Sequence, residues 1–152
     1  MEPIANSPTQ AESSDVTVQT GGDSPRPRVL AIDDNDGFRT MITEMLEPIG
    51  FEVKTAANPI KGLELFRQDQ GSYDLVIVDY YMPQLDGAKT FEWLRKLNPE
   101  VKVIICSGAE ELRLRQIQAQ HKIDGYLHKP FRIQEAIQLI CRLTHSPVPA
   151  HA

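Results

Sequence analysis

Two patterns of apolar residues alternate along the middle of the chain. Short runs of strand length lie at 29–32, 51–56, 75–78, 101–106 and 125–128. Between these runs, apolar residues recur every three or four positions, as on a helix with one buried face, over 36–49, from 59 onward, and over 88–97, 110–120 and 133–143. Successive strand–helix units of this kind predict a doubly wound α/β fold with a five-stranded parallel sheet and five helices.

The strand-length runs differ in how their polar residues are placed. The runs at 29–32, 75–78 and 101–106 are almost entirely apolar, which is typical of central strands covered on both faces. The run at 51–56 alternates between apolar and polar residues, which favours a place at the edge of the sheet. The pattern therefore predicts a sheet whose centre is buried by helices on both sides.

The helical stretches carry start and stop signals of their own. We expect Asp36 to cap the first helix, Gly50 to end it, and Pro59 to take the first position of the second helix. The residues expected to face the sheet are Phe38, Met41, Ile42, Met45, Leu46 and Ile49 in the first helix, Ile60, Leu63 and Phe66 in the second, Phe91, Leu94 and Leu97 in the third, and Ile133, Ala136, Ile137, Ile140 and Leu143 in the fifth.

Both ends of the chain have a different composition. Residues 1–27 are rich in Ser, Thr, Pro, Gly and Gln and contain few large apolar residues, so we expect a disordered N-terminal tail. Residues 144–152 contain Pro147 and Pro149, which a helix does not pass through, and we expect a short C-terminal tail there. One domain over 28–143 remains between the tails.

Charge and composition exclude several classes of function. The net charge of -5 and a pI near 5.3 argue against a nucleic-acid partner, because phosphate backbones bind basic faces. The sequence contains neither a signal peptide nor an apolar run long enough to span a bilayer, which predicts a cytoplasmic protein without membrane insertion. The two cysteines, Cys106 and Cys141, are expected to be buried, reduced thiols.

Polar residues of particular kinds follow four of the predicted strands. Asp33 and Asp34 follow the first strand and Asp79 the third, whereas Ser107 follows the fourth and Lys129 the fifth. Open α/β sheets place ligand sites at the carboxyl ends of their strands, so these side chains are expected to meet. Clustered carboxylates need a cation, and oxygen ligands suit Mg²⁺. The hydroxyl and the ammonium are left to bind an anion, which predicts a site for a metal and a phosphoryl group.

Further residues complete a pattern over about 28–143. Met82-Pro83 and Asp86-Gly87 follow Asp79, Gly108 follows Ser107, and Tyr126 precedes Lys129-Pro130-Phe131. Together with the aspartates, and in this order, these residues resemble the receiver domain of two-component response regulators, of the single-domain chemotaxis-regulator kind. The resemblance implies a flavodoxin-like fold with strand order 2-1-3-4-5. It also implies a cis peptide bond between Lys129 and Pro130.

The resemblance assigns a chemical role to each site residue. Asp79 would accept a phosphoryl group from a sensor histidine kinase or a histidine phosphotransfer protein. Asp33, Asp34, Asp79 and the backbone carbonyl of Tyr81 would hold Mg²⁺, and Lys129 would pair with the phosphoryl oxygens. Such a domain is a phosphoacceptor and not an enzyme, since it catalyses only its own phosphorylation and slow dephosphorylation.

The resemblance also implies how phosphorylation is read out. Ser107 would be the switch hydroxyl and Tyr126 the switch aromatic, and the face of the fourth helix, fifth strand and fifth helix would change shape. No output module follows the fifth helix in this sequence, so we expect a stand-alone domain. Its output is then either binding of a downstream target protein or onward phosphorelay, and the sequence does not separate the two.

Three other functions are less consistent with the residues. A calcium loop over Asp33–Gly37 fails in register, because Gly37 as sixth residue puts Ile32 first and Thr43 twelfth, where acids are required. A phosphohydrolase with an aspartyl nucleophile needs an acid two residues after Asp79, where Tyr81 stands. A receiver-like binding module that works without phosphorylation would not need the complete set of site residues.

Two positions in this chain bear on the lifetime of the phosphorylated form. Tyr81 lies two residues after Asp79, and Ala109 two residues after Ser107. By the resemblance, both positions border the path of the attacking water. A large ring at Tyr81, with no acid or amide at Ala109 to orient water, predicts slow self-hydrolysis.

Overall fold

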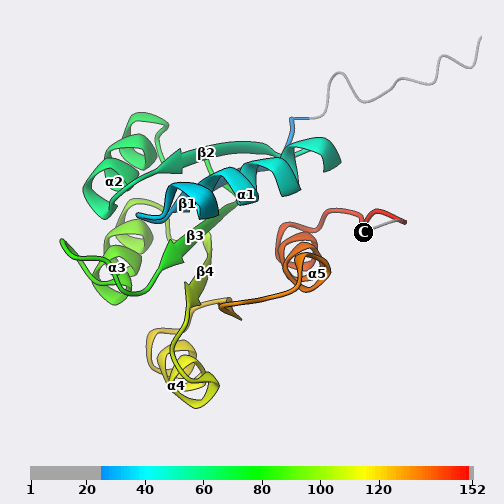
Figure 1. The fold of residues 1–152 in the computed structure, drawn as a ribbon. Helices are drawn as coiled ribbons and strands as arrows, with labels where there is room; N and C mark the ends of the chain where they lie inside the picture. Colours follow the sequence, from blue (N-terminus) through cyan, green and yellow to red (C-terminus); the bar gives the residue numbers. More distant parts are fainter. Residues whose placement is uncertain (1–24, 151–152) are drawn as a thin grey trace, which may run out of the picture.

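Five strands and five α-helices alternate within residues 25–150, which are the residues that the computed structural model describes (Figure 1). The strands are β1 (Arg28–Ile32), β2 (Glu52–Ala56), β3 (Leu75–Asp79), β4 (Lys102–Ser107) and β5 (Gly125–His128). The helices are α1 (Asp36–Leu46), α2 (Pro59–Gln68), α3 (Gly87–Leu97), α4 (Glu111–His121) and α5 (Ile133–Thr144). The tail predicted at 1–27 lies, except for its last three residues, outside the described range.

The strands form one parallel sheet in the order β2-β1-β3-β4-β5. This order and the alternation with helices confirm the flavodoxin-like, doubly wound fold. At the carboxyl edge, Ile32 of β1 pairs with Val78 of β3, and Asp79 pairs with Cys106 of β4. The residues that follow each strand therefore emerge side by side along one edge of the sheet.

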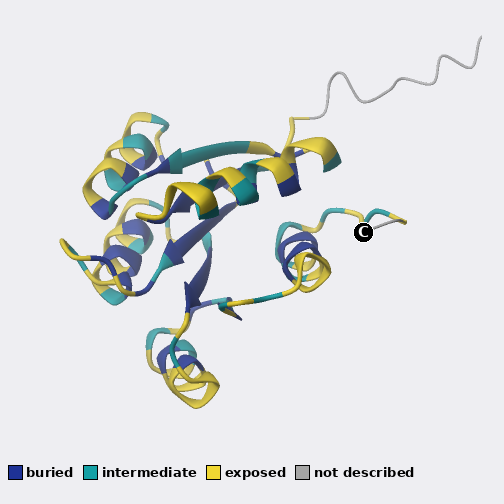
Figure 2. Ribbon diagram, viewed as in Figure 1, coloured by how far each residue is buried: buried dark blue, intermediate teal, exposed yellow. Residues whose placement is uncertain are grey.

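The core has two layers because successive residues of a strand point to opposite faces. On one face, Leu30, Val76 and Val103 pack in a cluster that includes Phe66 of α2 and Phe91 of α3. On the other face, side chains such as Ala31, Ile77 and Ile104 pack with residues of α1 and α5. Figure 2 shows the central strands buried and each helix exposed on its outer side. The fully apolar central strands that the sequence predicts follow from this double cover.

Most predicted helix boundaries are confirmed within one residue or two, and one cap is corrected. Asn35 rather than Asp36 caps α1, because the Asn35 Oδ1 atom accepts a hydrogen bond from the Phe38 amide at 2.9 Å. The helix passes into a short 3₁₀ turn at Glu47–Ile49, and Gly50 then ends it at a left-handed φ of 102°. Pro59 opens α2 as expected.

Three residues predicted to face the sheet are exposed instead. The exposed fractions are 58% for Ile60, 43% for Leu97 and 52% for Ile133. Ile60 and Ile133 lie in the first turn of their helices and Leu97 ends its helix, beyond the part that the sheet covers. The remaining predicted residues of α2, α3 and α5 are buried or half-buried.

The two cysteines are free and buried, as predicted. Burial raises the pKa of the Cys106 thiol to about 12, so it stays protonated near neutral pH. Over residues 25–150, no helix has both the length and the apolar character needed to cross a membrane.

Candidate functional site

Three carboxylates meet at the carboxyl edge of the sheet. Asp33 and Asp34 follow β1, and Asp79 ends the neighbouring strand β3. Each residue offers a carboxylate oxygen, and these oxygens all lie within 4.8 Å of one another. Asp33 is buried, Asp79 is half-buried and Asp34 is exposed, so the cluster opens to solvent on one side.

Backbone amides and one ammonium hold the two less exposed carboxylates in place. The Asp33 Oδ1 atom accepts a hydrogen bond from the Asn35 amide at 2.9 Å, and its Oδ2 atom accepts one from Lys129 Nζ at 2.7 Å. The Asp79 Oδ1 atom accepts from the Tyr81 amide at 3.1 Å, and Lys129 Nζ lies 3.9 Å from its Oδ2 atom. Lys129 therefore bridges the carboxyl ends of β1 and β3.

Burial and neighbouring charges together shift the pKa of two groups in the cluster. Burial raises the pKa of Asp79 above its usual value, assisted by the charges of Asp33 and Asp34 and opposed by Lys129 and the Tyr81 amide. Burial alone would lower the pKa of Lys129, but the hydrogen bond to Asp33 and the charges of Asp33 and Asp79 raise it overall. Lys129 is therefore held in its charged form, and it lies beside Asp79, whose carboxyl group is harder to ionise than usual.

The donor set matches a hard divalent cation. Three carboxylates whose oxygens approach within 4.8 Å repel one another unless a positive charge lies between them. Oxygen-only ligands with one side open to water are what Mg²⁺ prefers in proteins. The residues present therefore fit Mg²⁺.

Lys129 reaches the cluster from the loop after β5. Its backbone amide donates to the carbonyl of Ser107 at 2.7 Å, and its bond to Pro130 is cis, as the resemblance implied. The Phe38 ring centre lies 4.1 Å from Lys129 Nζ, and the Phe38 ring meets that of Phe131 edge-on at 6.0 Å. The sequence predicts Phe38 on the buried face of the first helix, but the spacing of apolar residues does not predict its contact with the Lys129 ammonium.

The loop after Asp79 packs closely against the start of α3. The Gly87 amide donates to the Tyr80 carbonyl at 2.9 Å, and a Cβ atom on Gly87 would lie 2.8 Å from the Tyr80 Cα atom. Only glycine fits this close approach. Tyr81 points outward with 58% of its surface exposed, and its ring lies edge-on to that of Tyr80.

Ser107 and Tyr126 lie on neighbouring strands but in different surroundings. Ser107 is buried at the end of β4, where its Oγ atom accepts a hydrogen bond from the Ala109 amide at 3.1 Å. Tyr126 on β5 is half-buried, and its hydroxyl donates to Glu111 Oε1 at 3.2 Å and accepts from Arg115 Nε at 3.3 Å. The sequence missed both partners, because the many polar residues of α4 do not reveal which of them contact a neighbouring strand.

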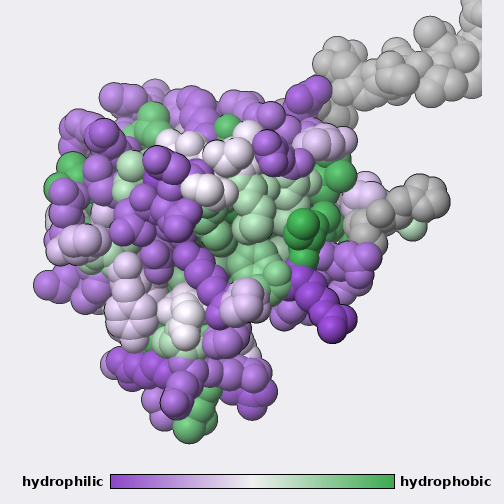
Figure 3. All heavy atoms as spheres, in the orientation of Figure 1, coloured by the Kyte–Doolittle hydropathy of each residue, from purple (hydrophilic) through white to green (hydrophobic). Residues whose placement is uncertain are grey.

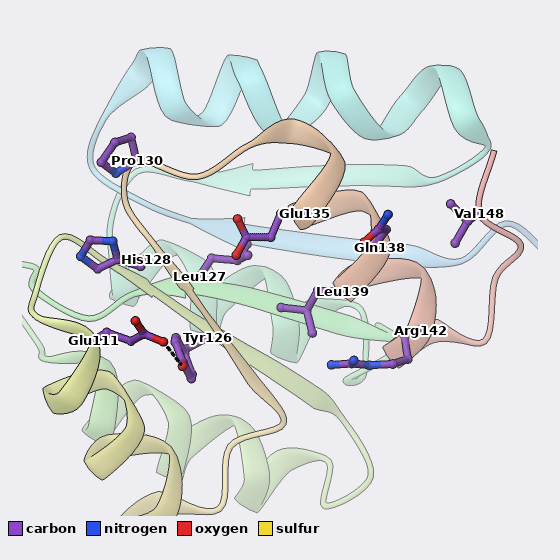
Figure 4. A pocket seen from close by; sticks show the side chains of 10 residues that line it. All are labelled: Glu111, Tyr126, Leu127, His128, Pro130, Glu135, Gln138, Leu139, Arg142 and Val148. Carbon is purple, nitrogen blue, oxygen red and sulfur yellow. Dashed lines mark hydrogen bonds between the residues drawn. The ribbon is translucent and has the colours of Figure 1, made fainter. Parts of the chain in front are cut away.

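Figure 4 shows the groove in which this tyrosine network lies. It has a volume of about 750 Å³ between α4, β5 and α5, and Val148 from the segment after α5 also lines it. Tyr126 and Glu111 point toward each other on the α4 side of the groove, and the dashed line marks their hydrogen bond. This surface is the face of the fourth helix, fifth strand and fifth helix named from the sequence.

Known proteins resemble the chain over most of its length. Residues 29–141 match the response regulator receiver domain family. The sensor kinase CckA of Brucella abortus (strain 2308) is 35% identical over 108 residues, which are 70% of this chain and 11% of the kinase. The DNA-binding transcriptional regulator NtrC of Azospirillum brasilense is 30% identical over 124 residues, which are 82% of this chain and 25% of the regulator. The chain thus spans a quarter or less of the length of these two relatives.

Solved structures agree with the sequence match. The response regulator receiver domain protein from Clostridium thermocellum superimposes with a TM-score of 0.72 at 31% identity, over 78% of this chain and 94% of that protein. Together with the match over 29–141, this similarity shows that the chain belongs to the response regulator receiver domain family, the phosphoryl-accepting signalling domains of two-component systems.

Proposed function

We propose that this chain accepts a phosphoryl group on Asp79 from a phosphohistidine of a sensor histidine kinase or a histidine phosphotransfer protein. The observation that carries the proposal is the meeting of Asp33, Asp34 and Asp79 within 4.8 Å, with Lys129 Nζ at 2.7 Å from Asp33 and 3.9 Å from Asp79. In a member of the receiver family, this geometry supports Asp79 as the acceptor.

The chain's own residues orient the acceptor and balance its charge. An Asp79 oxygen attacks phosphorus, the phosphorus–nitrogen bond breaks, and its electron pair stays on the imidazole of the donor, which takes up a proton. The product is an aspartyl phosphate. The Tyr81 amide fixes one Asp79 oxygen, so the other faces the incoming group. Lys129, held as a cation, offsets the negative charge of the phosphoryl oxygens.

Mg²⁺ would be held by Asp33, Asp34, Asp79 and the backbone carbonyl of Tyr81. When bound, it supplies the positive charge that lets a carboxylate approach an anionic phosphoryl group. The burial of Asp33 and its two hydrogen bonds preorganise this ligand, whereas the exposed Asp34 leaves the cation accessible to water and to the donor.

Ser107 and Tyr126 are proposed to transmit the phosphorylated state. The Ser107 hydroxyl belongs to the strand next to Asp79, so it lies where it can turn toward a new phosphoryl oxygen. Tyr126 can then move inward if its hydrogen bonds to Glu111 and Arg115 break. The groove of α4, β5 and α5 would change shape, and a downstream target protein would read the change. We place this signalling in the cytoplasm.

An apolar rim beside Lys129 suits a protein donor. Phe38, Met41, Pro130 and Phe131 line a pocket of about 360 Å³ together with Lys129. Figure 3 shows a continuous apolar area between α1 and α5 in this region. A phosphohistidine-bearing helix packed there would bring its imidazole next to the acidic cluster.

The proposal is tested by incubating the protein with acetyl phosphate and measuring its intact mass. With Mg²⁺ we expect the mass of one added phosphoryl group, and with EDTA none. Asp79→Ala should gain nothing, whereas Asp36→Asn, which changes an exposed aspartate outside the cluster, should behave as wild type. Equal labelling of wild type and Asp79→Ala would refute the assignment. Label transfer from the phosphorylated chain to a histidine phosphotransfer protein separates a relay from a switch.

A further inference from the structure

Three large apolar side chains are exposed together between α2 and α3. Ile60, Trp93 and Leu97 expose 58%, 53% and 43% of their surface, and with the half-buried Leu63 they line a groove of about 380 Å³. The two helices pack against each other on one face of the sheet (Figure 1). No lining residue belongs to the acidic cluster or to the groove of α4, β5 and α5.

The core does not need these side chains. Phe66 of α2 and Phe91 and Leu94 of α3 already fill the space against the sheet. Ile60 and Leu97 extend the apolar stripes of their helices past the covered region, and Trp93 lies beside the stripe. Apolar atoms interrupt the polar surface over α2 in Figure 3. A grouped apolar surface of this kind marks a protein interaction site more often than scattered exposure does.

The charges beside the groove indicate its partner. Arg67 lines the groove, Lys96 Nζ lies 4.9 Å from the Trp93 ring centre, and Lys89 is exposed one turn before Trp93. Glu64 is the acid among the lining residues. Glu92, the residue before Trp93, is a second exposed acid. Three basic side chains against two acids leave the surroundings of the groove positive by one charge, in a chain whose net charge is -5. Two copies would bring these positive surroundings together, which disfavours self-association and favours an acidic partner.

We propose that the α2–α3 groove binds an amphipathic helix of a partner protein, with an apolar stripe in the groove and acidic residues beside Arg67 and Lys96. The apolar lining residues are three positions apart on α2 (Ile60 and Leu63) and four apart on α3 (Trp93 and Leu97). Residues at these spacings lie on one face of a helix, so each helix presents a row of apolar side chains against which a third helix can pack. This interaction needs no phosphoryl group and goes beyond the proposed function.

Trp93 is the sole tryptophan of the chain, so its fluorescence reports on the groove directly. The probe is a synthetic helical peptide with leucines on one face and glutamates on both flanks, and its twin carries lysines in place of the glutamates. With the acidic peptide we expect a saturable blue shift of the emission. The lysine twin should bind at least tenfold more weakly.

Variants distinguish specific binding in the groove from non-specific binding of the peptide elsewhere on the protein. The double variant Arg67→Glu and Lys96→Glu should reverse the preference between the two peptides, whereas Arg113→Glu on α4 should leave it unchanged. Ile60→Ser with Leu97→Ser keeps the reporter and should abolish binding, and circular dichroism checks that the fold is retained. The proposal is overturned if the acidic peptide leaves the emission unchanged, if both peptides bind equally, or if emission shifts with protein concentration alone, which would indicate a second copy in the groove.

Discussion

Replacing Asp79 with asparagine is expected to stabilise the metal-free protein. In the absence of a cation, ionised Asp79 faces Asp33 and Asp34 at no more than 4.8 Å. At an effective dielectric constant of about 20, each such repulsion amounts to about 3.5 kcal/mol, and the attraction of Lys129 at 3.9 Å amounts to about 4 kcal/mol. The contribution of the exposed Asp34 must be discounted for solvent screening. The charge terms therefore nearly cancel, and burial of the carboxylate, the largest cause of its raised pKa, tips the balance against the ionised form. We expect Asp79→Asn to gain about 1 kcal/mol in the free energy of unfolding.

The pH dependence of this gain has a definite sign. The pKa of Asp79 is raised from 3.8 by folding, so its ionised form destabilises the folded state. That destabilisation is fully present above the raised pKa and disappears as the pH falls below 3.8. The advantage of Asp79→Asn should therefore be complete at neutral pH and should shrink toward zero in acid.

Urea unfolding in EDTA measures the effect, with Glu92→Gln on the exposed side of α3 as control for the loss of one negative charge. Added Mg²⁺ should stabilise the wild type more than the variant, because binding to the folded state alone raises its stability. If Asp79→Asn unfolds at the same or a lower urea concentration than the wild type in EDTA at neutral pH, the carboxylates do not repel as described and the reasoning fails.

Three further predictions concern single side chains near the site. Phe38→Leu should slow phosphorylation by acetyl phosphate by about fivefold, since it removes a cation–π contact with Lys129 worth about 1 kcal/mol. The rate is measured from the intact mass of samples quenched at successive times, and an unchanged rate would show that the ring does not position the ammonium. Tyr81→Asn should shorten the lifetime of the phosphorylated protein several-fold, because an amide there orients water, and an unaltered decay of the labelled mass would remove this idea. Glu111→Gln should loosen the hydrogen bonds that hold Tyr126 outward, and NMR of the tyrosine ring should then show a larger inward population in the unphosphorylated protein; a spectrum identical to that of wild type would argue against the restraint.

The fold could be predicted because the alternation of an apolar strand with an amphipathic helix is repeated along the chain. Each central strand is apolar on both faces, and every helix except the mostly polar α4 carries a clear apolar stripe, so the pattern alone indicates a parallel sheet between two helical layers. The meeting of Asp33 with Asp79 follows from the same logic, since parallel neighbours end at one edge. The strand order did not follow from the pattern and came from the resemblance to receiver domains.

The sequence pattern does not predict how far the sheet covers each helix, nor which side chains of different elements contact one another. Helical spacing does not tell how far the sheet covers a helix, so it predicts a buried position for Ile60, Leu97 and Ile133, which are exposed. The hydrogen bond of Lys129 to Asp33 rather than to Asp79 depends on the path of the loop after β5. The contact of Glu111 with Tyr126 joins residues 15 positions apart on different elements. Such contacts are set by tertiary packing and leave no periodic signal.

The most direct test of the central claim is to locate the phosphoryl group on the chain. The protein is incubated with acetyl phosphate and Mg²⁺ and then treated with borohydride, which reduces an aspartyl phosphate to homoserine, and peptides are sequenced by mass spectrometry. We predict homoserine at position 79 alone, and none when Mg²⁺ is replaced by EDTA. Homoserine at another aspartate, with residue 79 unchanged, would contradict the account.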